Sequence, residues 1–133
     1  MPSLLSSALR PPCAETLGWE LIAEYPAEGR IEIAFYANET MLNPRGAVQG
    51  GFVAAMLDDT MGPALVSMSG DRDAPVSLDL NVSFLRPVML GRLIGKGRVV
   101  SRSKSVAFLE AELFDEAGNL LARSTSTAKI VPI

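Results

Sequence analysis

The segment QGGFVAAMLDDTMG, residues 49–62, places two adjacent carboxylates, Asp58 and Asp59, within a stretch of small and apolar residues. A carboxylate in such a stretch is a candidate nucleophile or general base. The chain contains no histidine, so neither aspartate has an imidazole partner. Gly50 and Gly51 begin the segment, and exposed N–H groups at a helix start can stabilise an oxyanion. These residues indicate chemistry at a carbonyl carbon, although the glycine pair alone is also typical of a flexible entry turn.

A predicted helix from Gly51 to about Ser67 carries both aspartates. At 100° per residue, one broad arc holds the large apolar side chains Phe52, Val53, Met56, Leu57, Met61 and Leu65. The opposite arc is a stripe of small residues with one acid, formed by Gly51, Ala55, Asp58 and Gly62. This small-residue stripe allows a ligand or another backbone to come close, so Asp58 is the candidate catalytic residue. A surface aspartate or plain helix packing are the alternatives, and Asp59 is expected to be solvated or hydrogen-bonded.

The spacing between Gly50 and Asp58 restricts the mechanism. Eight residues of helix separate them by about 12 Å, whereas a reacting carbonyl must lie about 3 Å from both the oxyanion donor and the attacking group. One helix therefore cannot supply both groups to the same carbon. If both act, Asp58 must come from a second copy of the chain, which predicts a two-fold dimer with two equivalent sites. Pro63 lacks the amide that would bond the Asp59 carbonyl, so a kink is expected there.

The rest of the chain predicts strands around this helix. Strand-like runs cover 19–25, 30–37, 76–84, 92–101, 105–114 and 120–131, and residues 1–17 form a short helix or irregular arm. The run at 76–84 alternates strictly, which places Ser77 on a solvent-facing row with Asp79, Asn81 and Ser83. One apolar helix and about six antiparallel strands predict an α+β fold in which the sheet curls around the helix.

Composition excludes several classes of function. The 133 residues suit a single domain, and the net charge of −3 with no basic cluster argues against nucleic acid as a partner. No uncharged apolar stretch reaches the ~20 residues that span a bilayer, and the N-terminus is a poor secretory signal. The lone Cys13 fits a reducing compartment. We therefore expect a soluble cytoplasmic protein.

Several motifs together resemble the hotdog-fold acyl-CoA thioesterases of the PaaI-like, phenylacetate-degradation branch. They are LGW at 17–19, Asn43 followed by Gly46, QGGFVAAMLDDTMG, VSLDLNVSFLRPV at 76–88, Gly91, and LLARSTSTAKI at 120–130. The motifs cover nearly the whole chain. The family pattern is an Asn, then His-Gly-Gly, then an acidic residue nine positions after the His. Asn43, Gly50 and Asp58 occupy the matching positions.

The resemblance implies a site at a dimer interface, in dimers that commonly pair into tetramers. The Gly50 amide would polarise the thioester carbonyl, and Asp58 of the neighbouring subunit would be nucleophile or general base. Asn43 would position the water or thioester, and Ser77 would orient the water. The residues expected to contact substrate are Gly51, Phe52, Met56 and Met61, with Arg98, Arg102 and Lys104 facing the phosphates of coenzyme A or simply ending strands in solvent. No metal or bound cofactor is implied; coenzyme A enters only with the substrate.

The departure from the family is Gln49, which stands where the family usually has His. Its amide can donate a hydrogen bond to the substrate but cannot titrate; alternatively, it caps or packs the loop. The hotdog dehydratases and hydratases need a catalytic histidine, which this chain lacks. A second alternative is a catalytically weak or inactive hotdog module that binds acyl-CoA as a sensor or regulator.

Overall fold

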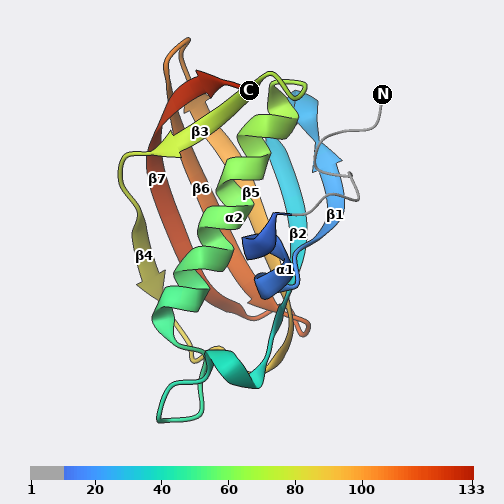
Figure 1. Ribbon diagram of the computed structural model, residues 1–133, viewed down its shortest axis with the longest axis vertical. Coiled ribbons are helices and arrows are strands. Elements are labelled where there is room, and N and C mark those ends of the chain that lie inside the picture. Colours follow the sequence, from blue (N-terminus) through green and yellow to red (C-terminus); the bar gives the residue numbers. More distant parts are fainter. Residues whose placement is uncertain (1–10) are drawn as a thin grey trace.

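The computed structural model describes residues 11–133, in which one long helix lies across a curved antiparallel sheet (Figure 1). The helices are α1 (Pro12–Leu17) and α2 (Gly50–Met68), with short 3-10 turns at Pro26–Glu28 and Glu39–Met41. The strands are β1 (Glu20–Tyr25), β2 (Arg30–Ala37), β3 (Asp73–Ser77), β4 (Asn81–Phe84), β5 (Gly91–Arg102), β6 (Val106–Asp115) and β7 (Leu120–Pro132). Their order is β1-β2-β5-β6-β7-β3, and β4 also pairs with β7. The predicted α+β hotdog fold is confirmed.

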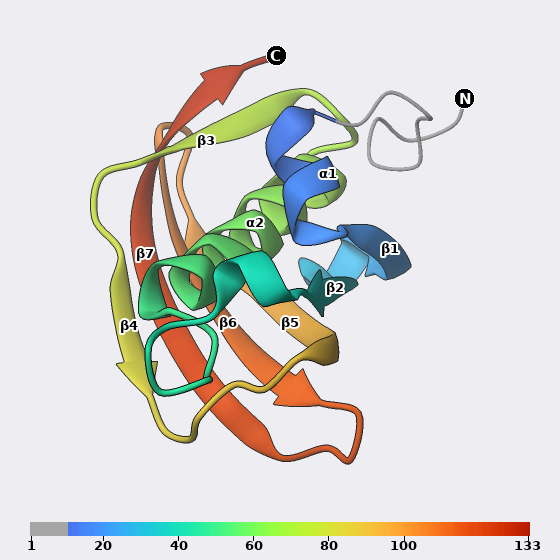
Figure 2. The ribbon, with the colours of Figure 1, turned by 60° about the horizontal axis from the view of Figure 1, so that its bottom comes forward.

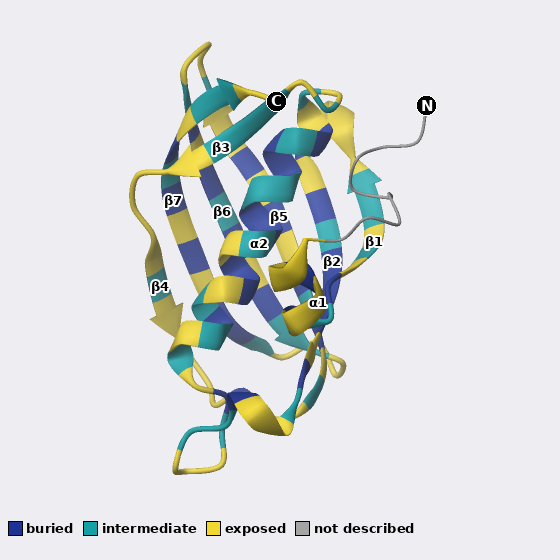
Figure 3. Ribbon diagram, viewed as in Figure 1, coloured by how far each residue is buried: buried dark blue, intermediate teal, exposed yellow. Residues whose placement is uncertain are grey.

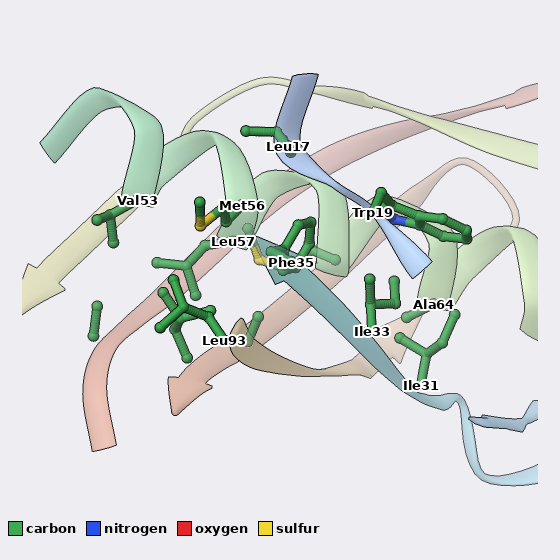
Figure 4. Close-up of a cluster of buried hydrophobic side chains, with 14 of the residues drawn as sticks. Leu17, Trp19, Ile31, Ile33, Phe35, Val53, Met56, Leu57, Ala64 and Leu93 are labelled. Atoms are coloured by element: carbon green, nitrogen blue, oxygen red, sulfur yellow. The ribbon is translucent and has the colours of Figure 1, made fainter. Parts of the chain in front are cut away.

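The core fills the space between α2 and the concave face of the sheet (Figures 2 and 3). Val53, Met56 and Leu57 of α2 are buried against side chains from β2 and β5, among them Phe35 and Leu93 (Figure 4). Close packing at Thr60 requires glycine on β5, because a Cβ on Gly97 would lie 2.8 Å from the Thr60 carbonyl oxygen. The apolar arc predicted for the helix is therefore the face that meets the sheet.

Pro63 does not end α2, which continues to Met68. The Asp59 carbonyl that Pro63 leaves without a helical donor accepts a hydrogen bond from the Trp19 indole Nε1–H at 3.1 Å. Trp19 is buried immediately before β1, directly after the left-handed Gly18 that ends α1. The tryptophan of the LGW motif thus replaces the N–H donor that Pro63 lacks. The partly buried Asp59 carbonyl therefore keeps a hydrogen bond.

The run at 76–84 forms two short strands instead of one, so the sheet has seven strands. Ser77 pairs with Ala128 and Asn81 with Thr125, so three residues on this side oppose two on β7. This one-residue bulge reverses the alternation. Ser77 therefore lies on the same face as the buried Ala128, toward α2, whereas Asn81 lies on the outer face. All four residues of the predicted row, Ser77, Asp79, Asn81 and Ser83, are exposed as predicted, but the bulge places Ser77 and Asn81 on opposite faces, so the four do not form one row on a single face.

At the N-terminus, the structure describes the chain only from Pro11 onward. α1 confirms a short helix before Trp19, and Cys13 on it is exposed. Residues 1–10 of the short helix or arm expected over 1–17 lie outside the described residues. Within residues 11–133, no helix is both long and apolar enough to cross a membrane.

Candidate active site

The start of α2 is fixed by the loop that precedes it. Leu42 and Val48 form an antiparallel bridge, the Val48 N–H donates to the Val88 carbonyl at 2.8 Å, and the Gln49 N–H donates to the Met41 carbonyl at 2.8 Å. The loop 43–47 and the segment 85–90 therefore meet at the N-terminal end of the helix, which Figure 2 brings forward. This arrangement places the Gly50 amide at the positive end of the helix dipole.

Gln49 is the N-cap of α2. Its side-chain Oε1 accepts the Gly51 N–H at 2.7 Å, which is possible because Gly51 has no Cβ; a Cβ there would lie 2.7 Å from Oε1. The expectation that both Gly50 and Gly51 leave their amides free is therefore wrong for Gly51. Within the described chain, the Gly50 N–H has no hydrogen-bond acceptor and is the free donor of the pair. Because Oε1 is held by the cap, the Gln49 Nε2 donors point away from Gly51 N–H.

A cavity of about 500 Å³ opens beside Gly50. The Phe84 ring covers Gly50, and a Cβ on this glycine would lie 3.2 Å from the ring. Apolar side chains form most of the wall; the lining residues are Asn43, Arg45, Gly46, Ala47, Val48, Gly50, Val53, Phe84, Leu85, Arg86, Pro87, Val88 and Met89. Concave, mostly apolar surfaces with a few polar groups are typical of small-molecule sites.

Asn43 lies on this cavity and also shapes its wall. Its Oδ1 accepts the N–H groups of Arg45 at 2.9 Å and Ala47 at 3.2 Å, and its backbone N–H donates to the Ala47 carbonyl at 2.7 Å. The side-chain oxygen is thus occupied by the turn, which orients the Nδ2 donors away from it. The role predicted for Asn43 as a positioning group is compatible with an amide that donates.

Asp58 and Ser77 are brought together by the fold. The Ser77 hydroxyl donates to Asp58 Oδ1 at 3.2 Å across the space between α2 and β3. Both residues are exposed, as are Gly51 and Ala55 of the small-residue stripe (Figure 3). Asp58 does not line the Gly50 cavity of its own chain. Gly50 and Asp58 therefore lie at separate places on one chain, in keeping with the ~12 Å between them along the helix.

Asp59 has a different environment from Asp58. Burial, and secondarily the neighbouring Asp58 charge, raises the pKa of Asp59 to about 6 from its ordinary 3.8. Its Oδ2 atom is buried without a hydrogen-bond partner in the described structure. The expectation that Asp59 is solvated or hydrogen-bonded is thus wrong for this oxygen; only its backbone carbonyl has the Trp19 donor. The two acids differ because Asp58 faces outward and Asp59 lies toward the flank of the helix.

Residues 45–122 match the Thioesterase superfamily. The chain belongs to this superfamily. Human acyl-coenzyme A thioesterase 13 is 30% identical to the chain over 104 residues, which are 76% of this chain and 73% of the human protein. A phenylacetic acid degradation-related protein from Ralstonia eutropha is 35% identical, with a TM-score of 0.87 over 95% of this chain and 96% of that one. The PaaI protein of Escherichia coli is 22% identical with a TM-score of 0.83, covering 92% and 86%, and shows the shared fold.

The resemblance to PaaI-like thioesterases is therefore confirmed, and the chain is a thioester hydrolase of the hotdog fold. In this thioesterase, Gly50 and Asn43 share one cavity and Asp58 contacts Ser77. No group of three or more His, Cys, Asp or Glu residues able to hold a metal occurs within residues 11–133.

The thioesterase buries two residues that were expected to line the acyl pocket. Met56 and Met61 are almost fully buried within the core of their own chain, and Met61 Sδ accepts a hydrogen bond from the Ser124 hydroxyl at 3.4 Å. Both lie on the helix arc that faces the sheet, so neither lines the Gly50 cavity. Phe52 is half-buried and packs against the core. The sequence pattern identified these residues as large and apolar but did not distinguish core from cavity.

The cations expected to meet coenzyme A do not line the Gly50 cavity of the same thioesterase chain. Arg98 is ion-paired with Glu110 at 2.8 Å, and Arg102 with Asp73 at 3.1 Å. Lys104 is in the turn between β5 and β6. Asp73 begins β3 just after the C-terminal end of the 19-residue α2, about 28 Å along the helix from Gly50. Within one protomer these residues do not share a site with the Gly50 cavity.

The sequence alone did not single out Phe84, Arg45 and Arg86 as cavity residues. Phe84 was assigned to a strand face, and its contact with Gly50 depends on the bulge that turns it inward. Arg45 follows Asn43 closely in sequence, and this proximity was the one signal that pointed to it. Arg86 reaches the cavity only because the segment 85–90 crosses the helix start.

Proposed function

We propose that this thioesterase hydrolyses the thioester bond of a small or medium acyl-CoA or aryl-acyl-CoA. The observation that supports this most is the pair of half-sites: a free Gly50 amide on an apolar cavity, and an outward-facing Asp58 held by Ser77. An oxyanion donor and a carboxylate are the groups that acyl transfer to water requires. The human relative named acyl-coenzyme A thioesterase supports coenzyme A as the thiol.

The two half-sites become one site in a dimer. Two α2 helices that pack through the small-residue stripe would bring Asp58 of one chain to Gly50 of the other. The exposed positions of Gly51, Ala55 and Asp58 support this pairing. The exposed apolar side chains Val76, Leu78 and Leu80 on the adjacent edge add surface for burial. We further propose that dimers pair into tetramers.

In the proposed reaction, the thioester carbonyl accepts the Gly50 N–H, and the Gln49 Nε2 is a second donor. Asp58 attacks the carbonyl carbon directly, or takes a proton from a water oriented by Ser77 so that the water oxygen attacks. The tetrahedral oxyanion then collapses with cleavage of the carbon–sulfur bond, and the thiolate leaves as coenzyme A. In the direct route, water hydrolyses the resulting anhydride. Asn43 positions the thioester or water through its Nδ2 donors.

The reaction uses no metal or bound cofactor, and we place it in the cytoplasm.

The test is thiol release from a panel of short, medium and aryl acyl-CoAs by the wild type, Asp58→Asn and Ser77→Ala. We expect Asp58→Asn to lower kcat by at least about a thousandfold, since it removes the attacking or basic group. Ser77→Ala, which removes only an orienting hydrogen bond, should lower kcat about tenfold to a hundredfold. If no substrate shows Asp58-dependent release while acyl-CoA still raises the melting temperature, the protein is an acyl-CoA-binding sensor module instead.

A further inference from the structure

The Gly50 cavity is electropositive in an acidic protein. Arg45 and Arg86 are its charged lining residues, and no carboxylate lines it among the described residues. The whole chain has a net charge of −3. The cavity lining, with two cations and no acid, therefore has the opposite charge to the chain as a whole. A cleft lined by charge of one sign attracts ligands of the opposite sign.

These two arginines differ from the ion-paired cations of the molecule. Ion pairs in the described chain involve Arg30, Lys96, Arg98 and Arg102, and neither Arg45 nor Arg86. Arg86 Nη1 donates to the neutral Asn119 Oδ1 at 3.2 Å, and Asn119 in turn donates to Asp115. The nearest carboxylate to Arg86 in this network is thus separated from it by an amide. Both guanidinium groups retain donors for a ligand.

The backbone of each arginine is anchored beside the proposed reacting centre. The Arg45 N–H donates to Asn43 Oδ1 at 2.9 Å, and the Arg86 N–H donates to the Leu121 carbonyl at 3.0 Å. Phe84, two residues before Arg86, covers Gly50. A substrate whose carbonyl meets the Gly50 amide therefore passes between apolar walls to two arginines whose backbones are anchored.

We propose that Arg45 and Arg86 bind an anionic group of the thioester substrate at the mouth of the Gly50 cavity. This inference rests on the proposed hydrolysis of an acyl-CoA. Guanidinium groups bind phosphate and carboxylate oxygens in paired hydrogen bonds, so the two arginines recognise either the phosphates of coenzyme A or a terminal carboxylate on the acyl group. The cations that bind the substrate are then Arg45 and Arg86, in the cavity at the N-terminal end of α2.

The experiment measures kcat and KM of the wild type, Arg45→Gln, Arg86→Gln and the double variant. Three thioesters are used, one of coenzyme A and two of N-acetylcysteamine. The first is a neutral acyl-CoA, the second the same acyl group on N-acetylcysteamine, and the third a dicarboxylic acyl group on N-acetylcysteamine. Arg30→Gln, which removes an exposed arginine at the start of β2 that pairs with Glu28, is the matched control. Glutamine keeps much of the side-chain length and removes the charge.

If the arginines bind phosphate, the double variant raises KM for the acyl-CoA about tenfold or more, with kcat little changed, and leaves the neutral N-acetylcysteamine thioester unaffected. If they bind an acyl carboxylate, KM rises for the dicarboxylic N-acetylcysteamine thioester instead. Arg30→Gln should change neither. An active wild type whose KM values are the same in the double variant for all three substrates overturns the proposal while the proposed function stands.

A wild type that hydrolyses none of these thioesters and none of the acyl-CoA panel refutes the proposed function, and ligand binding then tests the arginines. Coenzyme A and a dicarboxylate thioester should each be tested for an increase in melting temperature. An increase in the wild type that the double variant loses supports the anion site. Equal shifts in both proteins, or no shift in the wild type, overturn it.

Discussion

At the residue scale, Gln49 has one observed function and one proposed function at the two ends of its side chain. Oε1 caps α2 through Gly51, and Nε2 is the donor that we propose for the substrate. Gln49→Glu keeps an acceptor at the positive helix end, so we expect unchanged or slightly higher stability. Gln49→Met removes the acceptor and should lower the free energy of unfolding by about 1 kcal/mol. Urea denaturation measures both.

The activities of the same variants test the donor. Gln49→Glu removes Nε2 and adds a negative charge near the developing oxyanion, so kcat should fall at least as far as in Gln49→Met despite the intact cap. Equal activity of Gln49→Glu and wild type would limit Gln49 to capping. The sequence allowed either a donor or a cap at this position, and the geometry confirms the cap.

Asp59 makes stability depend on pH. Its pKa of about 6 in the fold exceeds the ordinary 3.8, so the folded state binds more protons between these values and the free energy of unfolding falls as pH rises from about 4 to 7. After allowance for partial exposure, this contribution is about 1–2 kcal/mol. In Asp59→Asn the fall should be smaller by that amount in urea titrations, whereas the exposed-acid control Glu116→Gln should behave as wild type. An unchanged slope in Asp59→Asn would contradict the account.

At the element scale, Trp19, which lies between α1 and β1, is linked to α2 by its hydrogen bond to the Asp59 carbonyl. Trp19→Phe removes the indole donor to Asp59 and should cost about 1–2 kcal/mol of unfolding free energy. In a Pro63→Ala background, the new N–H at position 63 can bond the Asp59 carbonyl, so the cost of Trp19→Phe should be smaller. A double-mutant cycle by chemical denaturation is expected to show coupling of about 1 kcal/mol. Strictly additive effects would mean that the two donors do not substitute for each other.

The elements that periodicity predicted well are those with uninterrupted patterns. The apolar arc of α2 identified its buried face, and the strands predicted at 92–101, 105–114 and 120–131 agree with β5, β6 and β7. The bulge between Ser77 and Asn81 was not predictable, because it depends on Asp79: its carboxylate accepts the Thr127 N–H at 2.7 Å, and its carbonyl accepts the Ser126 hydroxyl. The contact between Ser77 and Asp58 requires that bulge. A role for Ser77 was therefore reached from family resemblance, while its alternation pointed the other way.

At the scale of the whole molecule, the exposed small-residue stripe is the proposed contact between two chains. Ala55→Arg places a long charged side chain in the middle of this stripe. We expect this variant to be a folded monomer without activity, because Asp58 and Gly50 would no longer meet. Sedimentation velocity and circular dichroism measure assembly and folding. Ala27→Arg, at an exposed alanine on the turn between β1 and β2, is the control and should match wild type in both; a dimeric, active Ala55→Arg would exclude this face.

The central claim is that one site uses Gly50 of one chain and Asp58 of another, and mixed dimers test it most directly. Asp58→Asn lacks the acid, and Gly50→Pro lacks the amide N–H at a first helical position that tolerates proline. The Phe84 ring that faces Gly50 is 56% exposed and has room to move away from the proline. After equal amounts of the two inactive variants exchange subunits, each mixed dimer has one intact site, so we predict recovery of about a quarter of wild-type thiol release. No recovery, with exchange demonstrated by tagged subunits, would contradict the shared site.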